Sequence, residues 1–486
     1  MAAEVPNSMN ISTRDKENGV VDSLAELDAG ALFVLKSRGS WLHCGYHLTT
    51  SIVSPVLLGL PFALSLLGWV PGVVCLTLAT LLTFYCFYLL SVILEHHAQL
   101  GKRQLRFRDM ARDILGPGWD KFFVGPLQFL ICYGAVILGT LLGGQNLKFI
   151  YLLNNPNGEM QLYLFIIMFG AATLILAQMP SFHSLRHINL VSLMLSLAYG
   201  AGVTAGSIYI GKITRDKTLS EVPIHVLIRC AKTINYPAGH SKNAPSRDYS
   251  VKGTPVNRFL SALSGISIMA TAFGCGIVPE IQATLAPPLK GKMFKGLCVC
   301  YGVIVSTFFS VGISGYWAFG NQIVGTILTN FMGGGKPLLP SWFLLVINIF
   351  TLAQITATTV IYLQPTNEMF EKWLADAKMD QFSIRNVVPR LIFRSLSVTV
   401  ATLFAAMLPF FGDILALFGA FGIIPLDCVL PIVFYNVTFK PIKQSTVFWG
   451  HTLIAIVSSM VAAVGTVASV RQIVLDAKTY NLFANM

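Results

Sequence analysis

Residues 54–61 read SPVLLGLP and residues 273–280 read FGCGIVPE, and both stretches place glycine and proline inside a long apolar segment. Proline supplies no backbone N–H and glycine tolerates non-helical backbone, so both residues interrupt a helix. In hydrocarbon, a broken helix survives only where protein, water or a ligand satisfies the freed backbone groups. Two such breaks in corresponding halves of one chain predict a ligand site between them.

The composition is that of a protein embedded in a lipid bilayer. Of 486 residues, 54% are hydrophobic and only 12% are charged, whereas soluble domains average about 25% charged residues. We therefore predict an all-α, multi-pass integral membrane protein. The net charge of +12 is explained by basic cytoplasmic loops, and no feature of the sequence favours nucleic acid as a partner.

Eleven apolar segments have close to the ~20 residues that a bilayer requires. If the first five and the next five form two inverted repeats, the breaks fall in the first and sixth spans, which are equivalent positions. The eleventh span then lies outside the repeat. The predicted spans are 44–68, 70–94, 122–153, 160–179, 187–211, 258–284, 295–319, 341–365, 387–409, 412–436 and 447–470.

The orientation follows from the basic residues, which gather in every second short loop. The loop after the second predicted span, for example, contains Lys102, Arg103 and Arg106. The positive-inside rule then places the N-terminus in the cytoplasm and the C-terminus outside. The polar N-terminal residues lack the pattern of a cleavable signal peptide. We expect a cytoplasmic segment at 1–43, a transmembrane domain at 44–470 and an external tail at 471–486.

Each break offers backbone groups to a charged ligand. In the first, Gly59 and Pro61 are expected to free carbonyl groups near residues 54–58, which could hold an ammonium group, while the next half-helix could hold a carboxylate at its N-terminus. In the second, Pro279 is expected to start a new half-helix. The alternatives are an ordinary proline kink in the first segment and, for Gly274 and Gly276, close packing of helices through small residues.

Charged residues inside the predicted spans are few, and Glu280, Arg394 and Asp427 are the clearest. Each costs roughly 2.5–3.5 kcal/mol at the centre of a bilayer. Glu280 falls in the first turn of the expected half-helix, and a carboxylate shielded from water can bind a proton, so it is the candidate for proton coupling. The alternative is an interfacial carboxylate bonded to neighbouring loops. Arg394 is expected to pair with an acid or to reach the membrane surface.

Enzymatic chemistry has no support in the sequence. No nucleophile–base arrangement and no nucleotide-binding loop is present, and the nine cysteines lack metal-ligand spacing. We therefore predict no catalytic residues and no metal site.

Several long motifs resemble the plant amino acid/auxin permease family, and within it the GABA-transporter branch. They are DAGALFVL at 28–35, PSFHSLRHIN at 180–189, PEIQATLAPP at 279–288, ISGYWAFG at 313–320 and MLPFFGD at 407–413. The resemblance covers nearly the whole chain. It implies a leucine-transporter-like fold of eleven helices, with broken first and sixth helices. It also implies a symporter in the plasma membrane that imports a small zwitterionic amino acid, GABA first, with the proton as coupling ion and no other cofactor.

The resemblance also implies where the substrate binds, which is between the first and sixth helices. The residues that correspond here are Ser54, Val56, Leu58, Gly59, Leu60, Thr271, Phe273, Gly274, Cys275 and Gly276.

One loop departs from the family pattern and from the charge rule. The external loop 212–257 contains an expected insertion at 212–240, which carries Lys212, Arg215 and Lys217. A retained intron and a lineage-specific insert both explain it. The functional alternatives also stay open: another amino acid or auxin as cargo, or a nutrient receptor of the same fold that binds without net transport.

Overall fold

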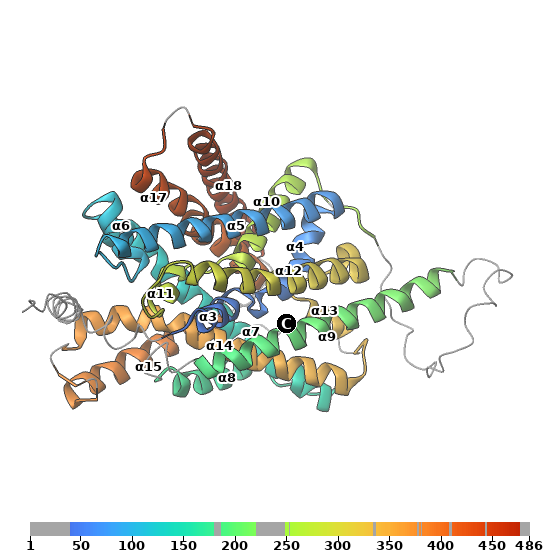
Figure 1. The fold of residues 1–486 in the computed structure, drawn as a ribbon. Coiled ribbons are helices and arrows are strands. Elements are labelled where there is room, and N and C mark those ends of the chain that lie inside the picture. Colours follow the sequence, from blue (N-terminus) through green and yellow to red (C-terminus); the bar gives the residue numbers. More distant parts are fainter. Residues whose placement is uncertain are drawn as a thin grey trace, which may run out of the picture.

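The computed structural model describes residues 39–178, 186–219, 248–251, 253–333, 337–376, 379–380, 382–407, 411–442 and 445–476. Figure 1 shows these residues as a bundle of long helices. The described residues form no β-strand, and a single isolated bridge pairs Gly39 with Leu285. The all-α prediction is confirmed.

The first helix is built from three pieces, as the interrupted sequence predicts. Helix α3 is followed by the short 3₁₀ helix η1 and then by α4. Three long helices, α5, α7 and α9, follow, together with the shorter α8 and the connecting helix α6. The bounds are α3 Trp41–Ile52, η1 Pro55–Gly59, α4 Leu60–Leu67, α5 Trp69–Gln99, α6 Phe107–Leu115, η2 Asp120–Val124, α7 Gly125–Asn154, α8 Leu162–Leu176 and α9 Arg186–Leu219.

The second half begins with another broken helix, α10 and α11. The tenth predicted span is a composite of α16, the π-helix η6 and α17. The bounds are α10 Pro255–Phe273, α11 Val278–Ala283, α12 Lys292–Phe319, η4 Gly320–Gln322, α13 Ile327–Phe331, α14 Ser341–Leu374, α15 Ile384–Met407, α16 Phe411–Leu417, η6 Phe418–Val429, α17 Leu430–Phe439 and α18 Thr446–Asp476.

The predicted spans match the helices that the structure describes. Among the described residues, ten helical segments are long and apolar enough to cross a membrane. The remaining predicted span, 160–179, corresponds to the shorter apolar helix α8, Leu162–Leu176. The last helix runs on to Asp476, past the predicted boundary at 470.

The two broken helices occupy the centre of the bundle. In the first, Trp41–Leu67, 83% of the apolar stretch is buried, against 28% for α18 at the periphery. Helix α3 packs on α9 and α12, while α4 packs on α10 and α12. A centre built from broken helices positions backbone groups, rather than side chains alone, for contact with a ligand.

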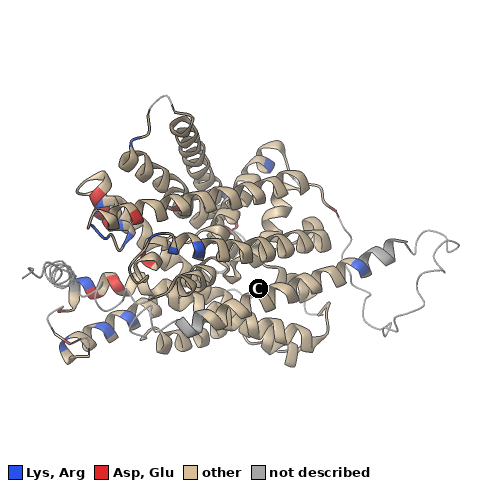
Figure 2. Ribbon diagram, viewed as in Figure 1, with Lys and Arg blue, Asp and Glu red and all other residues tan. Residues whose placement is uncertain are grey.

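Charged residues concentrate at one end of the bundle. Figure 2 shows lysine, arginine, aspartate and glutamate gathered around α6 and α15, with few at the opposite end. This is the end that the sequence assigns to the cytoplasm.

Some predictions fall outside the described residues. These are most of the N-terminal segment 1–43, most of the tail 471–486, and the part of the expected insertion that follows Leu219. Residues 212–219 continue α9 as helix. The insertion itself stays a prediction.

Candidate functional site

The first break lies at Val53 and Ser54. Helix α3 ends at Ile52, Ser54 is extended (φ −85°, ψ 163°), and Pro55 begins η1. The prediction that Gly59 and Pro61 free carbonyls near 54–58 is therefore wrong in detail. Pro61 lies in the first turn of α4, where no N–H is needed. Pro55 is the residue that ends the hydrogen-bond ladder, so the freed carbonyls are those of the last turn of α3.

Helix α14 supplies hydrogen-bond donors to those freed carbonyls. Three of its side chains, spaced four residues apart on one face of the helix, reach the end of α3. The bonds run from Gln354 Nε2 to Val53 O (3.1 Å), from Thr358 Oγ1 to Thr50 O (3.3 Å) and from Tyr362 Oη to Ser51 O (3.2 Å). The break is thus satisfied by protein on this side, as hydrocarbon requires.

The second break spans residues 274–277. Gly274 is extended and Gly276 has φ +64°, a conformation that a residue with a Cβ rarely adopts. The carboxylate of Asp427 accepts the freed N–H groups of Cys275 (2.7 Å) and Gly276 (3.0 Å). Asp427 is fully buried, so these charge-assisted bonds replace its hydration. The next half-helix, α11, begins at Val278, and Pro279 lies in its first turn, close to the predicted start.

Tyr362 connects the two breaks. Its hydroxyl lies 3.2 Å from Ser51 O and 3.0 Å from Cys275 O. A hydroxyl group carries one hydrogen, so it can donate fully to only one of these carbonyls at a time. The junction therefore has more acceptors than donors, and a ligand with N–H groups would correct this imbalance.

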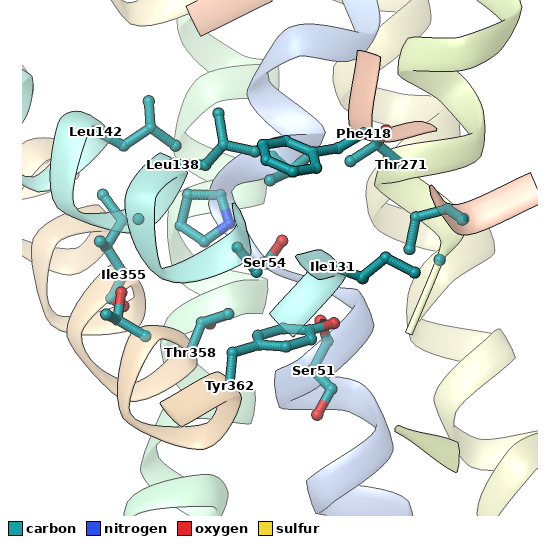
Figure 3. Close-up of a pocket in the computed structure, with 17 residues that line it drawn as sticks. Ser51, Ser54, Ile131, Leu138, Leu142, Thr271, Ile355, Thr358, Tyr362 and Phe418 are labelled. Atoms are coloured by element: carbon teal, nitrogen blue, oxygen red, sulfur yellow. Dashed lines mark hydrogen bonds between the residues drawn. The ribbon is translucent and has the colours of Figure 1, made fainter. Parts of the chain in front are cut away.

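A narrow cavity lies between the breaks. Figure 3 shows Ser54 near its centre, Tyr362 on one wall and Phe418 on the opposite wall. Most of the wall is apolar, and the few polar side chains come from α3, α10, α14 and the Ser54 position between α3 and η1. The lining residues are Ser51, Ser54, Pro55, Val56, Ile131, Ala135, Leu138, Gly139, Leu142, Thr271, Gly274, Ile355, Thr358, Thr359, Tyr362, Phe418 and Ile423.

Four of the ten residues expected at the substrate line this cavity: Ser54, Val56, Thr271 and Gly274. The other six do not. Leu58, Gly59 and Leu60 are buried in packing, and Phe273 meets Phe308 edge to face. Cys275 and Gly276 hold the break together through their backbone groups instead.

The cavity joins helix ends of opposite polarity. The N-terminus of the η1–α4 segment presents the Val56 N–H, which donates to no other described residue. The C-terminal end of α10 lies across from it, and Gly274, which has no side chain, lines the cavity with its backbone. A helix N-terminus attracts anions and a C-terminus attracts cations.

Glu280 lies outside this cavity, in the first turn of α11. Its Oε1 accepts hydrogen bonds from Phe107 N (2.9 Å) and Gln128 Nε2 (2.8 Å), whereas its buried Oε2 has no partner among the described residues. It borders a second, smaller cavity together with Arg108 and Glu368. The bond from Phe107 N fits the prediction of a carboxylate bonded to a neighbouring loop, and the unsatisfied Oε2 fits the prediction of a proton-binding group. Both predictions for Glu280 stay predictions.

Ion pairs connect the start of α6 to α14 at the charged end of the bundle, beside Glu280. Arg106 and Arg108, at the start of α6, each lie 2.6 Å from the carboxylate of Glu368 on α14. Arg394, predicted to pair with an acid, contacts Glu371 at 2.5 Å. Among the described residues, no group of three His, Cys, Asp or Glu side chains could hold a metal ion.

Sequence reasoning missed the residues that other helices bring to the breaks. Gln128 on α7 donates both to Gly276 O (3.0 Å) and to Glu280. The α14 donors Gln354, Thr358 and Tyr362 could have been found, because polar residues at four-residue spacing within an apolar span mark a face that contacts protein. No sequence pattern pairs Asp427 with the second break.

A family model and two related proteins identify the family of this chain. The family model described as "Transmembrane amino acid transporter protein" matches residues 37–472. GABA transporter 1 of Arabidopsis thaliana is 52% identical over 95% of this chain and 96% of its own length. Lysine histidine transporter-like 1 of the same plant is 26% identical over 100% of this chain and 99% of its own.

Solved structures confirm the fold. A Na⁺-coupled sialic acid symporter in a substrate-bound, outward-open state aligns with a TM-score of 0.50 at 11% identity, over 96% of each chain. The structure thus has a leucine-transporter-like fold. The matching family and its relatives are transporters rather than enzymes. The chain belongs to the transmembrane amino acid transporter family, also called the amino acid/auxin permease family.

Proposed function

We propose that this protein is a proton-coupled symporter that imports a small zwitterionic amino acid, GABA first, by alternating access. The observation that carries the proposal is the cavity between the two breaks, which offers a helix N-terminus and a helix C-terminus to one ligand. GABA is favoured because the chain is 52% identical to a GABA transporter over nearly its full length.

The geometry suits the two charged ends of such a substrate. The carboxylate would bind the Val56 N–H and the Ser54 hydroxyl, at the positive end of η1–α4. The ammonium would bind near Gly274 and Tyr362, where carbonyl acceptors outnumber donors. The methylene chain would lie along the apolar wall, where burial contributes about 0.8 kcal/mol per CH₂.

Proton coupling would use Glu280. A buried carboxylate with one unpartnered oxygen is costly when charged, and a bound proton removes this cost. Glu280 also touches α6 through Phe107 N and the second break through Gln128. Its protonation would therefore alter bonds at the second break and at the charged end of the bundle together.

Release to the cytoplasm would require the charged end to open. The Arg106 and Arg108 pairs with Glu368 tie α6 to α14, and Arg103 donates to Ala283 O (3.0 Å) and Leu285 O (2.6 Å) beyond α11. These contacts would separate in the inward-facing state. The gathering of basic residues at this end supports a cytoplasmic N-terminus, and we place the protein in the plasma membrane.

The test is uptake of labelled GABA into proteoliposomes with an imposed pH gradient, inside alkaline. The wild-type protein should accumulate GABA, and an auxin or a different amino acid should compete poorly. Glu280→Gln should bind and exchange GABA but lose gradient-driven accumulation, while Glu159→Gln, which changes an exposed loop carboxylate, should behave as wild type.

Three results would count against the proposal. Binding without accumulation would indicate a receptor. Preference for an aromatic acid without an amino group would indicate an auxin carrier. Unchanged gradient-driven uptake by Glu280→Gln would remove Glu280 as the coupling residue.

A further inference from the structure

Buried hydrogen bonds join the first break to α9 and α14, through side chains that do not line the central cavity. Gln354 Nε2 donates to Val53 O (3.1 Å), and Ser192 Oγ donates to Gln354 Oε1 (2.5 Å). Ser196 Oγ lies 3.3 Å from the same Val53 O. Gln354 is not among the residues that line the central cavity.

The orientation of the Gln354 amide is fixed by its partners. Val53 O can only accept a hydrogen bond, so the NH₂ group must face it. The amide oxygen then faces Ser192, whose hydroxyl can donate. Gln354, Ser192 and Ser196 are at most 1% exposed, and water therefore does not compete for these bonds.

The carbonyls at the end of a broken membrane helix have two common kinds of partner. A coordinated cation can neutralise their partial negative charge, or donors from neighbouring helices can do so. Here the carbonyls of Val53 and Thr50 each have a side-chain donor from α14 within 3.3 Å, and the Ser51 carbonyl shares the Tyr362 hydroxyl with Cys275 O. A cation bound to Val53 O from this side would have to displace the Gln354 amide.

We infer that Gln354 is a positioning residue that holds the first break in shape, with its amide N–H in the place that a coordinated metal cation would otherwise take. The break then keeps its geometry with no sodium or potassium ion. Ser192 supports this role by fixing the amide. Because Ser54 follows Val53 directly and Val56 lies two residues further on, the amide also sets where the carboxylate of the proposed substrate would bind, a consequence that rests on the proposed function.

The experiment compares Gln354→Met with Gln364→Met. Both glutamines are fully buried on α14, but the Gln364 side chain has no hydrogen-bond partner among the described residues. Methionine has a similar length and donates no hydrogen bond. Two measurements are made at one fixed pH: the melting temperature of purified protein in detergent, and GABA counterflow in proteoliposomes with choline, Na⁺ or K⁺ as the only cation.

The inference predicts that wild-type melting temperature and counterflow are the same in all three cations. Gln354→Met should melt several degrees below Gln364→Met, because Val53 O loses its nearer donor and Ser192 its acceptor. Its half-saturating GABA concentration should rise roughly tenfold, which corresponds to about 1.4 kcal/mol, whereas Gln364→Met should leave this concentration near the wild-type value. Ser192→Ala should shift it in the same direction by less.

Two results would overturn the inference. The first is a wild-type protein that gains thermal stability or counterflow specifically from Na⁺ or K⁺, since a cation would then occupy the break. The second is a Gln354→Met protein that matches Gln364→Met in melting temperature and half-saturation. The melting measurement needs no transported substrate, so a protein that fails to transport GABA still tests the positioning role.

Discussion

Asp427 provides the sharpest test of how the second break is held. Its carboxylate accepts the N–H groups of Cys275 and Gly276, and both bonds reach the same oxygen, Oδ2, at 2.7 and 3.0 Å. Asp427→Ala leaves two buried N–H groups without a partner. Each such group costs about 1–3 kcal/mol, so the variant should lose roughly 2–6 kcal/mol of stability.

Asp427→Asn separates the loss of charge from the loss of the acceptor. An amide oxygen placed at the Oδ2 position keeps both hydrogen bonds, at the strength of neutral rather than charge-assisted bonds, and should cost about 1–2 kcal/mol. The predicted order of stability is therefore wild type, then asparagine, then alanine. Half-saturation for substrate should worsen in the same order, because Gly274 at the cavity wall adjoins the pair of anchored residues.

Thermal unfolding of the purified variants in detergent, together with GABA counterflow, measures both effects. Equal losses for the alanine and asparagine variants would show that the charge, and not the anchoring of the two N–H groups, accounts for the stability. An alanine variant as stable as wild type would refute the reasoning altogether.

Two further substitutions examine the breaks. Tyr362→Phe removes the hydroxyl near Ser51 O and Cys275 O but keeps the ring, so the half-saturating GABA concentration should rise about 2–12-fold (0.5–1.5 kcal/mol). The half-saturating concentration of butyrate, which is GABA without its amino group, should stay constant when it is measured by competition. Equal effects on both ligands would exclude contact between Tyr362 and the ammonium. Gly276→Ala forces a Cβ into a backbone with φ +64°, which should cost about 1–2 kcal/mol of stability and abolish uptake. The control Gly101→Ala, at φ +80° with open space around it, should lose similar stability in a melting experiment and keep uptake. Full transport activity of Gly276→Ala would contradict the importance of this conformation.

Much of the architecture could be predicted from the sequence because membrane spans are selected by length and apolarity. The two breaks could be found as well, since proline and glycine act locally on the helix that contains them. The exact position of the first break was missed. Either Pro55 or Pro61 could have ended the ladder, and only the fold shows that Pro61 falls in the first turn of α4.

The partners of the breaks could not be predicted in the same way. Gln128, Gln354 and Asp427 lie on helices far along the chain, and which of their faces meets the breaks depends on how α7, α14 and η6 pack. Glycine and leucine positions near a break also look alike in sequence, whether they face the cavity or the packed interior. The sequence therefore does not show that Gly274 lines the cavity whereas Gly59 is buried in packing.

The central claim is that one zwitterion lies between the two breaks, with its ends on opposite helix termini. A cryo-EM structure determined with saturating GABA tests this most directly. The account predicts ligand density in the cavity between Ser54 and Tyr362, with the carboxylate at the Val56 N–H and the ammonium beside Gly274. Density for GABA elsewhere in the bundle, or an empty cavity in a protein that is shown to transport GABA, would contradict it.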